Sequence, residues 1–321
     1  MSTALPATLI DAVAAIAAGR LSASELAEEE LARIARTDGA VEAWESLDPA
    51  HVRREAARCD REAVTGPLAG IGIGVKDIID TRDFDTAMGS PIYAGHRPTA
   101  DAPCVARLRA AGAYVFGKTV TTPFAFMDPG KTRNPWHREH SPGGSSSGSA
   151  AAVAAGQVLA AIGTQTNGSV VRPAAYCGVV GFKPTLHAIP YAGAHLFSAQ
   201  FDTLGTFTRT VADAARLASV LADPGRIAPV EKSKPAAAPA PVAAPVPKPR
   251  KLSYKEQREL DELPQRIEAL EAEQKALDEL LADPDAYVKD PQRMAQANKR
   301  HAQIDEELLA ALERWEALGT K

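Results

Sequence analysis

Cysteine and long apolar runs are scarce in this chain of 321 residues, and each scarcity excludes a class of protein. Cys59, Cys104 and Cys177 are too few and too irregularly spaced for a disulfide framework or a zinc site, and they favour a reducing compartment. No stretch approaches the ~20 apolar residues of a membrane span. The apolar patch Leu9–Ala18 is interrupted by Asp11 and has no basic leader. We therefore expect a cytoplasmic protein that does not contact a membrane.

A strong excess of one charge is also lacking. The formal charge of -4 and the isoelectric point near 6.0 argue against bulk electrostatic binding to nucleic acid. Aromatic residues make up only 5%, whereas 45% of the chain is hydrophobic and 24% is charged. This composition is typical of a soluble globular protein, with room for one large domain or two smaller ones.

The first 222 residues alternate helix-like, strand-like and turn-like patterns, which predicts an α/β domain with a mixed β-sheet covered by helices. Residues 8–62 have a helical pattern, with a capping box at Ser22–Glu25. In Ile71–Lys76, apolar residues alternate with glycine, as in a half-buried strand. The other predicted elements are a helix at Cys104–Ala111, a strand at Tyr114–Phe116 and helices at Ser149–Ala155 and 211–222.

The composition changes abruptly between Pro224 and Pro249, where eight prolines and many alanines predict a linker over 223–250. Beyond it, apolar positions recur in steps of three and four in two segments, separated by a break at Leu281–Asp285 and a restart at Asp290. This spacing predicts an antiparallel helical hairpin over 251–321. The predicted seam consists of Leu260, Leu263, Ile267, Leu270, Gln274, Leu277, Leu281, Met294, Ala297, His301, Ile304, Leu308, Ala311, Trp315 and Leu318.

Three short motifs combine a lysine with hydroxyl groups and turn-forming residues: Gly74–Asp77, Ser141–Ala150 and Thr166–Pro173. A serine attacks a carbonyl only if a base removes its proton and backbone N–H groups receive the developing oxyanion, and glycine-rich turns present such groups. Burial at the end of a strand would lower the pKa of Lys76 toward the working pH, as a base requires. Asp77 must then point away from it.

These segments resemble the amidase signature family. The resemblance runs from Pro67–Lys76 and Gly89–Tyr93 through the two serine motifs to Cys177–Pro184. It implies hydrolysis of a small-molecule amide through an acyl-enzyme, without a metal or organic cofactor. Amidase-signature domains normally continue beyond the point where this chain changes to linker, so we expect part of the sheet and of the substrate pocket to be missing.

The resemblance also implies a role for each motif residue. Ser169 would be the nucleophile, Ser145 the bridging serine on a cis Gly144–Ser145 peptide, and Lys76 the base. The oxyanion donors would be the backbone N–H groups of Thr166, Asn167, Gly168 and Ser169, with supporting positions at Gly144, Ser146 and Arg172. The chain departs from the common family pattern at Gln165 and Asn167, where Asp and Gly are frequent, and Asn167 is expected to narrow the site.

Two other motif matches are rejected on physical grounds. Gly112–Thr119 fits the phosphate-loop pattern, but its middle residues are bulky and β-prone. Gly144–Gly148 fits the nucleophile-elbow pattern with Ser146 at its centre, but His187 and His195 come too early for the triad that this elbow requires.

The tail leaves a second function open. Through Lys251–Leu260 it resembles the C-terminal coiled-coil domain of some ABC-F type ATPases, which implies contact with nucleic acid or the ribosome. Its 11 basic and 17 acidic residues give a formal charge of -6, which does not favour nucleic acid. The alternative is therefore a catalytically impaired fusion whose hairpin is an interaction module. Homo-oligomerisation through the hairpin also stays open.

Overall fold

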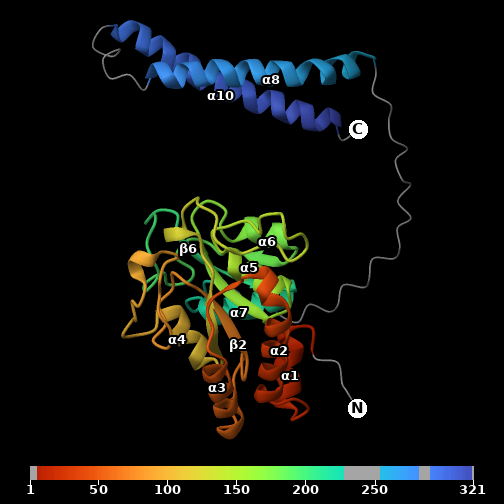
Figure 1. The fold of residues 1–321 in the computed structure, drawn as a ribbon, viewed down its shortest axis with the longest axis vertical. Coiled ribbons are helices and arrows are strands. Elements are labelled where there is room, and N and C mark those ends of the chain that lie inside the picture. Colours follow the sequence, from red (N-terminus) through yellow and green to blue (C-terminus); the bar gives the residue numbers. More distant parts are fainter. Residues whose placement is uncertain (1–5, 228–253, 282–289, 320–321) are drawn as a thin grey trace. The chain divides into compact units, whose positions relative to one another are not determined.

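The computed structural model describes residues 6–227, 254–281 and 290–319 (Figure 1). The chain divides into two compact units, Met1–Pro235 and Ala236–Lys321, and the boundary falls inside the range predicted as linker. Most of that range, together with residues 251–253 of the ABC-F-like segment and the predicted break after Leu281, lies outside the described residues.

The first unit contains a six-stranded mixed sheet with the strand order β1-β3-β2-β4-β6-β5. Strand β2 pairs in parallel with β3 on one side and with β4 on the other. The outer pairs are antiparallel: β1 with β3, β6 with β4, and β5 with β6. The strands are β1 Trp44–Ser46, β2 Gly72–Lys76, β3 Tyr114–Thr119, β4 Ala160–Gln165, β5 Val180–Phe182 and β6 Thr203–Thr208. The predicted mixed sheet is confirmed.

Helices cover both faces of this sheet, because side chains alternate along each strand between two buried clusters. Val115 belongs to a cluster with residues of α1, α4 and α7, whereas Tyr114 and Phe116 belong to a cluster with residues of α2, α3, α5 and α6. The helices are α1 Leu9–Ala17, α2 Ala23–Val41, α3 Pro49–Arg61, α4 Pro103–Ala110, α5 Ser147–Ala154, α6 Val171–Cys177 and α7 Val211–Leu221, with short 3-10 helices at Pro91–Tyr93 and Pro123–Ala125.

The capping box at the start of α2 is confirmed: Ser22 Oγ accepts a hydrogen bond from Glu25 N at 3.0 Å, and Glu25 Oε2 accepts one from Ser22 N at 2.8 Å. The sequence patterns missed β1, β4, β5, β6 and α6. Strand β4 has the sequence Ala-Ala-Ile-Gly-Thr-Gln, and alanine and glycine carry little strand propensity. Tertiary packing, rather than local preference, therefore determines this strand.

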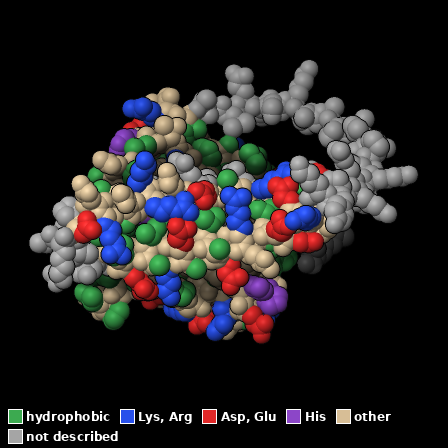
Figure 2. Space-filling view, turned by 90° about the horizontal axis from the view of Figure 1, so that it is seen from above, with side chains coloured by type: hydrophobic (Ala, Val, Ile, Leu, Met, Phe, Trp, Pro, Cys, Tyr) green, Lys and Arg blue, Asp and Glu red, His purple; other side chains and the backbone are tan. Residues whose placement is uncertain are grey.

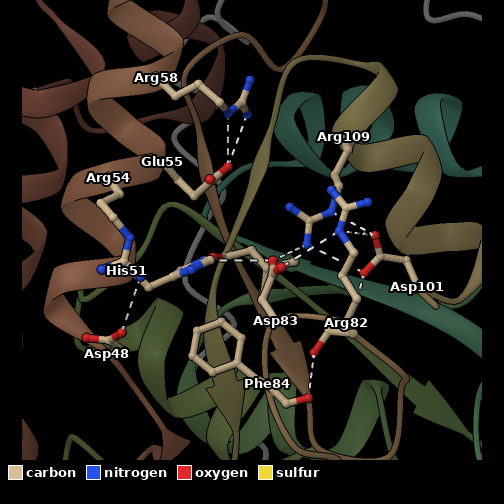
Figure 3. A network of polar contacts seen from close by, with 12 residues as sticks. Asp48, His51, Arg54, Glu55, Arg58, Arg82, Asp83, Phe84, Asp101 and Arg109 are labelled. Carbon is tan, nitrogen blue, oxygen red and sulfur yellow. Dashed lines mark hydrogen bonds and ion pairs between the residues drawn. The ribbon is translucent and has the colours of Figure 1, made fainter. Parts of the chain in front are cut away.

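The segment that follows β2 is fixed between α3 and α4 by a network of ion pairs (Figure 3). Arg109 of α4 donates to Asp101 Oδ2 from Nε at 2.9 Å and to Asp83 from Nη2. Asp83 also faces His51 of α3, whose Nε2 lies 3.9 Å away. The ring of Phe84 packs edge-to-face on His51, with 4.9 Å between the ring centroids. The chain that leaves Lys76 is therefore held by both helices.

The second unit contains helices α8, Tyr254–Leu281, and α10, Pro291–Gly319. Their antiparallel pairing is shown by ion pairs in which the numbers on α10 fall as those on α8 rise: Glu259 with Arg314, and Glu273 with Arg300, both at 2.8 Å. Leu263, Leu270, Met294, Ala297, Ile304, Ala311 and Leu318 of the predicted seam are buried.

One seam prediction is wrong. Trp315 is 47% exposed, whereas Ala311 and Leu318, about one turn to either side of it, are buried. Acidic and basic side chains are interspersed on the face seen in Figure 2, without a large patch of one sign. Within the described ranges, no helix is long and apolar enough to cross a membrane.

Glu30 of α2 is a buried acid far in sequence from the serine motifs. It is 5% exposed, and neither carboxylate oxygen forms a hydrogen bond within the described residues. Burial raises its pKa from 4.5 to about 8, and the positive charges of Arg209 and Arg33 act in the opposite direction. The folded protein therefore holds Glu30 neutral at pH 7. Because the unfolded chain loses this proton at a lower pH, Glu30 lowers the free energy of unfolding as the pH rises.

We predict that Glu30→Gln removes this dependence. Between about pH 4.5 and pH 8 the unfolding free energy of the unchanged protein should fall relative to that of the variant, by about 2 to 4 kcal/mol from the raised pKa. Denaturant unfolding at pH 5 and pH 8.5 measures the difference. The matched control is Glu29→Gln, since Glu29 is partly exposed and pairs with Arg36 at 3.4 Å. Parallel curves for Glu30→Gln and the unchanged protein would contradict the prediction.

Candidate active site

Lys76 is the last residue of β2, in the middle of the sheet. Ile71, Ile73 and Val75 pack into one buried cluster, so alternation directs Gly72, Gly74 and Lys76 to the opposite face. A Cβ at Gly72 would lie 2.4 Å from the Phe116 ring, which occupies the space of a side chain there. The lysine is therefore the first side chain of β2 on the face that carries α5.

The Lys76 amine is fully buried, and its hydrogen-bond partners among the described residues are hydroxyl groups. Nζ donates to Ser145 Oγ and to Thr164 Oγ1, both at 2.8 Å. Burial lowers the pKa of Lys76 from 10.5 to about 7, and the negative charge of Asp202 acts in the opposite direction. A large fraction of this lysine is therefore neutral near pH 7, and a neutral amine can accept a proton.

Asp77, the carboxylate next to Lys76 in sequence, pairs with a different lysine. Asp77 Oδ1 lies 3.3 Å from Nζ of Lys118, a second buried lysine, on β3. Lys118 also donates to Thr86 Oγ1 at 2.7 Å and to the Ile79 carbonyl at 2.9 Å. Burial raises the pKa of Asp77 and lowers that of Lys118, while their attraction opposes both shifts. Lys118 is the lysine of the rejected phosphate-loop match, and residues 114–119 form a buried strand instead.

Ser145 lies in the turn before α5, directly after the cis Gly144–Ser145 peptide. Ser146 fixes this turn to β4: its Oγ donates to the Thr164 carbonyl at 3.1 Å and accepts from Thr164 N at 3.3 Å. A Cβ at Gly163 would lie 2.6 Å from that hydroxyl oxygen, so the close approach requires glycine. Ser146 therefore has a structural role, and Ser145 is the serine bonded to Lys76.

Ser169 lies on the loop between β4 and α6, at the same cavity as Ser145. Gly168 has a φ of +115°, which favours glycine, and its carbonyl accepts from Arg172 N at 2.8 Å. The N–H groups of residues 167–169 have no protein acceptor within the described ranges. They are therefore free to bind a ligand oxygen.

Arg172 and Gln165 fix the two ends of this loop. Arg172 Nη2 donates to the Asn167 carbonyl at 3.2 Å. Gln165 Oε1 accepts from Val170 N at 2.9 Å and from Val171 N at 3.0 Å, and so caps the start of α6. Gln165, a departure from the common family pattern, thus has a clear structural role.

The structure brings two of the predicted residues, Lys76 and Ser145, into direct contact. The Ser169 hydroxyl makes no hydrogen bond to a described residue, although its carbonyl accepts from Ser146 N at 3.4 Å. Ser145 and Ser169 both line a cavity of about 510 Å³, together with Gly144, Asn167 and Arg172. Thr164 and Asp202 were not predicted. Thr164 could have been noticed as the hydroxyl two residues before Thr166.

These features define an α/β protein in which two serines line one cavity, and one of them, Ser145, is hydrogen-bonded to the buried Lys76 amine behind it. The chain belongs to the amidase family, whose model, described as Amidase, matches residues 25–294.

Two relatives are subunits of glutamyl-tRNA(Gln) amidotransferases. The one from Symbiobacterium thermophilum is 45% identical over 65% of this chain and 45% of the relative, and the one from a Roseiflexus species is 41% identical over 67% and 46%. Among solved structures, peptide amidase from Stenotrophomonas maltophilia is 37% identical, with a TM-score of 0.64, over 79% of this chain and 52% of that one. The chain thus spans about half the length of the relatives it matches.

We predict that Lys118→Met destabilises the protein by about 3 to 5 kcal/mol, because it leaves Asp77 buried without its partner. Adding Asp77→Asn should restore part of the loss. Lys131→Met is the control, since the pair between Lys131 and Glu45, 3.1 Å apart, is partly exposed and should change stability by less than about 1 kcal/mol. Urea unfolding of the four proteins measures the effects. Equal losses for Lys118→Met and Lys131→Met would refute the assignment.

Proposed function

We propose that this protein hydrolyses a carboxylic amide by acyl transfer, with Ser169 as nucleophile, Ser145 as proton relay and Lys76 as base. The observation that carries the proposal is the buried Lys76 amine, which donates to Ser145 Oγ at 2.8 Å and whose pKa is lowered to about 7. A lysine that lacks a carboxylate partner and is partly neutral at working pH is suited to general-base catalysis.

In the proposed first step, Ser169 Oγ bonds to the amide carbonyl carbon. Its proton passes to Ser145, whose own proton passes to Lys76. The carbonyl oxygen becomes an oxyanion, which the backbone N–H groups of Thr166, Asn167, Gly168 and Ser169 stabilise. The proton then returns to the leaving nitrogen as the C–N bond breaks, which leaves an acyl-enzyme and frees ammonia or an amine. Water attacks the ester by the same proton path and releases a carboxylate.

The charges around the cavity favour a substrate with a negative group. Four cationic side chains line the cavity: Lys131, Arg133, Arg138 and Arg172. Glu139 is the acidic side chain in the same lining. Lys131 and Arg133 are paired with glutamates at 3.1 and 3.8 Å. Arg138 and Arg172 have no acidic partner among the described residues. We therefore propose an amide that also carries a carboxylate.

The alternative function of the hairpin stays a prediction. None of the relatives named above is an ABC-F protein, and the Amidase model extends to residue 294, into α10. Several acidic and basic side chains of α8 and α10 are paired with each other across the two helices. No described residue of the hairpin points to nucleic acid or to the ribosome as a partner.

We predict that Ser169→Ala abolishes both amide turnover and labelling by a fluorophosphonate, because it removes the attacking oxygen. The structural consequence should be small, and thermal unfolding checks this. The control is Ser219→Ala, on the exposed side of α7, which should be labelled as fast as the unchanged protein. Labelling that survives in Ser169→Ala would exclude Ser169 as the nucleophile.

We also predict that a half-amide of a short dicarboxylic acid is hydrolysed with at least about tenfold higher kcat/KM than its neutral methyl ester, because a charge-assisted contact contributes about 1.5 to 3 kcal/mol. Arg172→Gln should remove most of this preference, whereas Arg216→Gln, on α7, should keep it. Equal rates for the two amides would contradict the proposed substrate class.

A further inference from the structure

The end of β4 fixes three different parts of the candidate site through three consecutive side chains. Thr164 Oγ1 accepts from Lys76 Nζ at 2.8 Å, and Gln165 Oε1 caps the start of α6. Thr166 Oγ1 donates to Asp202 Oδ1 at 2.5 Å. The first contact holds Lys76, the proposed base, and the second holds the loop that carries Ser169. The third connects the same loop to a carboxylate that the proposed reaction does not use.

Asp202 is a buried carboxylate, 5% exposed, in the residue before β6. Besides the Thr166 hydroxyl, its donors are the backbone N–H groups of Phe197 and Ser198, which bond to Oδ2 at 2.6 and 2.9 Å. These three donors are uncharged. These donors hold the Asp202 carboxylate in place, and no cation among the described residues forms an ion pair with it.

The charged surroundings of Lys76 show where the charge of Asp202 acts. Asp77, the nearest carboxylate in sequence, is paired with Lys118 on β3 at 3.3 Å. The groups that touch Lys76 Nζ are the neutral hydroxyls of Ser145 and Thr164. Tyr191 also lies close to this cluster, and burial raises the pKa of its phenol, which keeps it neutral. Thr164, which contacts Lys76, pairs with Leu204 of β6, so Asp202 lies two residues along the chain from this contact and is bonded to Thr166. Its negative charge opposes the effect of burial on the pKa of Lys76.

We propose that Asp202 is a positioning residue for the reaction, which fixes the nucleophile loop through Thr166 and supplies the negative field that balances the buried Lys76 amine. This role rests on the proposed amide hydrolysis, because it acts on the base and the oxyanion loop of that reaction. Without the Asp202 charge, protonated Lys76 is less stable, so the amine loses its proton at a lower pH. Without the Thr166 hydroxyl, the charge stays but the loop loses its tether.

The test is the rate of fluorophosphonate labelling of Ser169 in the full chain as a function of pH. For the unchanged protein the rate should rise with a midpoint near pH 7, the pKa of Lys76. Asp202→Asn should move this midpoint lower by about one pH unit. Thr166→Val should keep the midpoint and lower the plateau rate by about tenfold. Asp223→Asn is the control: it removes a carboxylate that pairs with Arg107 at 2.6 Å, and it should change neither quantity.

A midpoint in Asp202→Asn equal to that of the unchanged protein would overturn the electrostatic role, and a normal plateau in Thr166→Val would overturn the tether. Thermal unfolding identifies a variant that does not fold. If Asp202→Asn is such a variant, the plateau of Thr166→Val alone decides. Labelling of the unchanged protein at Ser169 separates the proposed amide hydrolysis from the proposed role of Asp202. If Ser169 is not labelled, both proposals fail. If it is labelled but the variants behave like the unchanged protein, only the role of Asp202 fails.

Discussion

The ion pair between Asp77 and Lys118 leaves the buried Lys76 amine without a carboxylate partner among the described residues. Two lysines are buried on adjacent strands, and the carboxylate next in sequence to Lys76 lies 3.3 Å from the other lysine instead. Within the described part of the chain the partners of Lys76 are therefore hydroxyl groups, and burial lowers its pKa to about 7. A carboxylate beside Lys76 would hold the amine protonated and remove it as a base. In the proposed reaction, Lys118 would therefore act only by holding Asp77 away from Lys76.

Small side chains make the rest of the arrangement possible. Gly163 on β4 leaves room for the Ser146 hydroxyl, and a Cβ at Gly148 in α5 would lie 2.3 Å from the Val120 nitrogen. The serine turn can therefore lie against the sheet, where Ser145 reaches the lysine. The polar side chains at the end of β4 then orient the loop that carries Ser169. Close packing and polar contacts thus act together at the point where Ser145 meets Lys76.

Much of this could be read from the sequence, and the parts that could not have a physical reason. The alternation before Lys76 predicted its strand, and a catalytic lysine required Asp77 to point away from it. The partner of Asp77 could not be predicted, since Lys118 is brought near by the parallel pairing of β2 and β3. Asp202 was missed for the same reason, because it reaches Thr166 through the antiparallel pairing of β4 and β6. Trp315 was misplaced, because spacing alone put it in the seam although the structure leaves it exposed between the buried Ala311 and Leu318.

The most direct test of the account is the protonation of Lys76 itself. An NMR titration of the full chain with isotope-labelled lysine, assigned by comparison with Lys76→Met, follows the side-chain amine. The account predicts that this amine titrates near pH 7, whereas exposed lysines titrate near their usual value of about 10.4. A Lys76 amine that stays protonated up to pH 10 would contradict the account, because such a group could not act as the base.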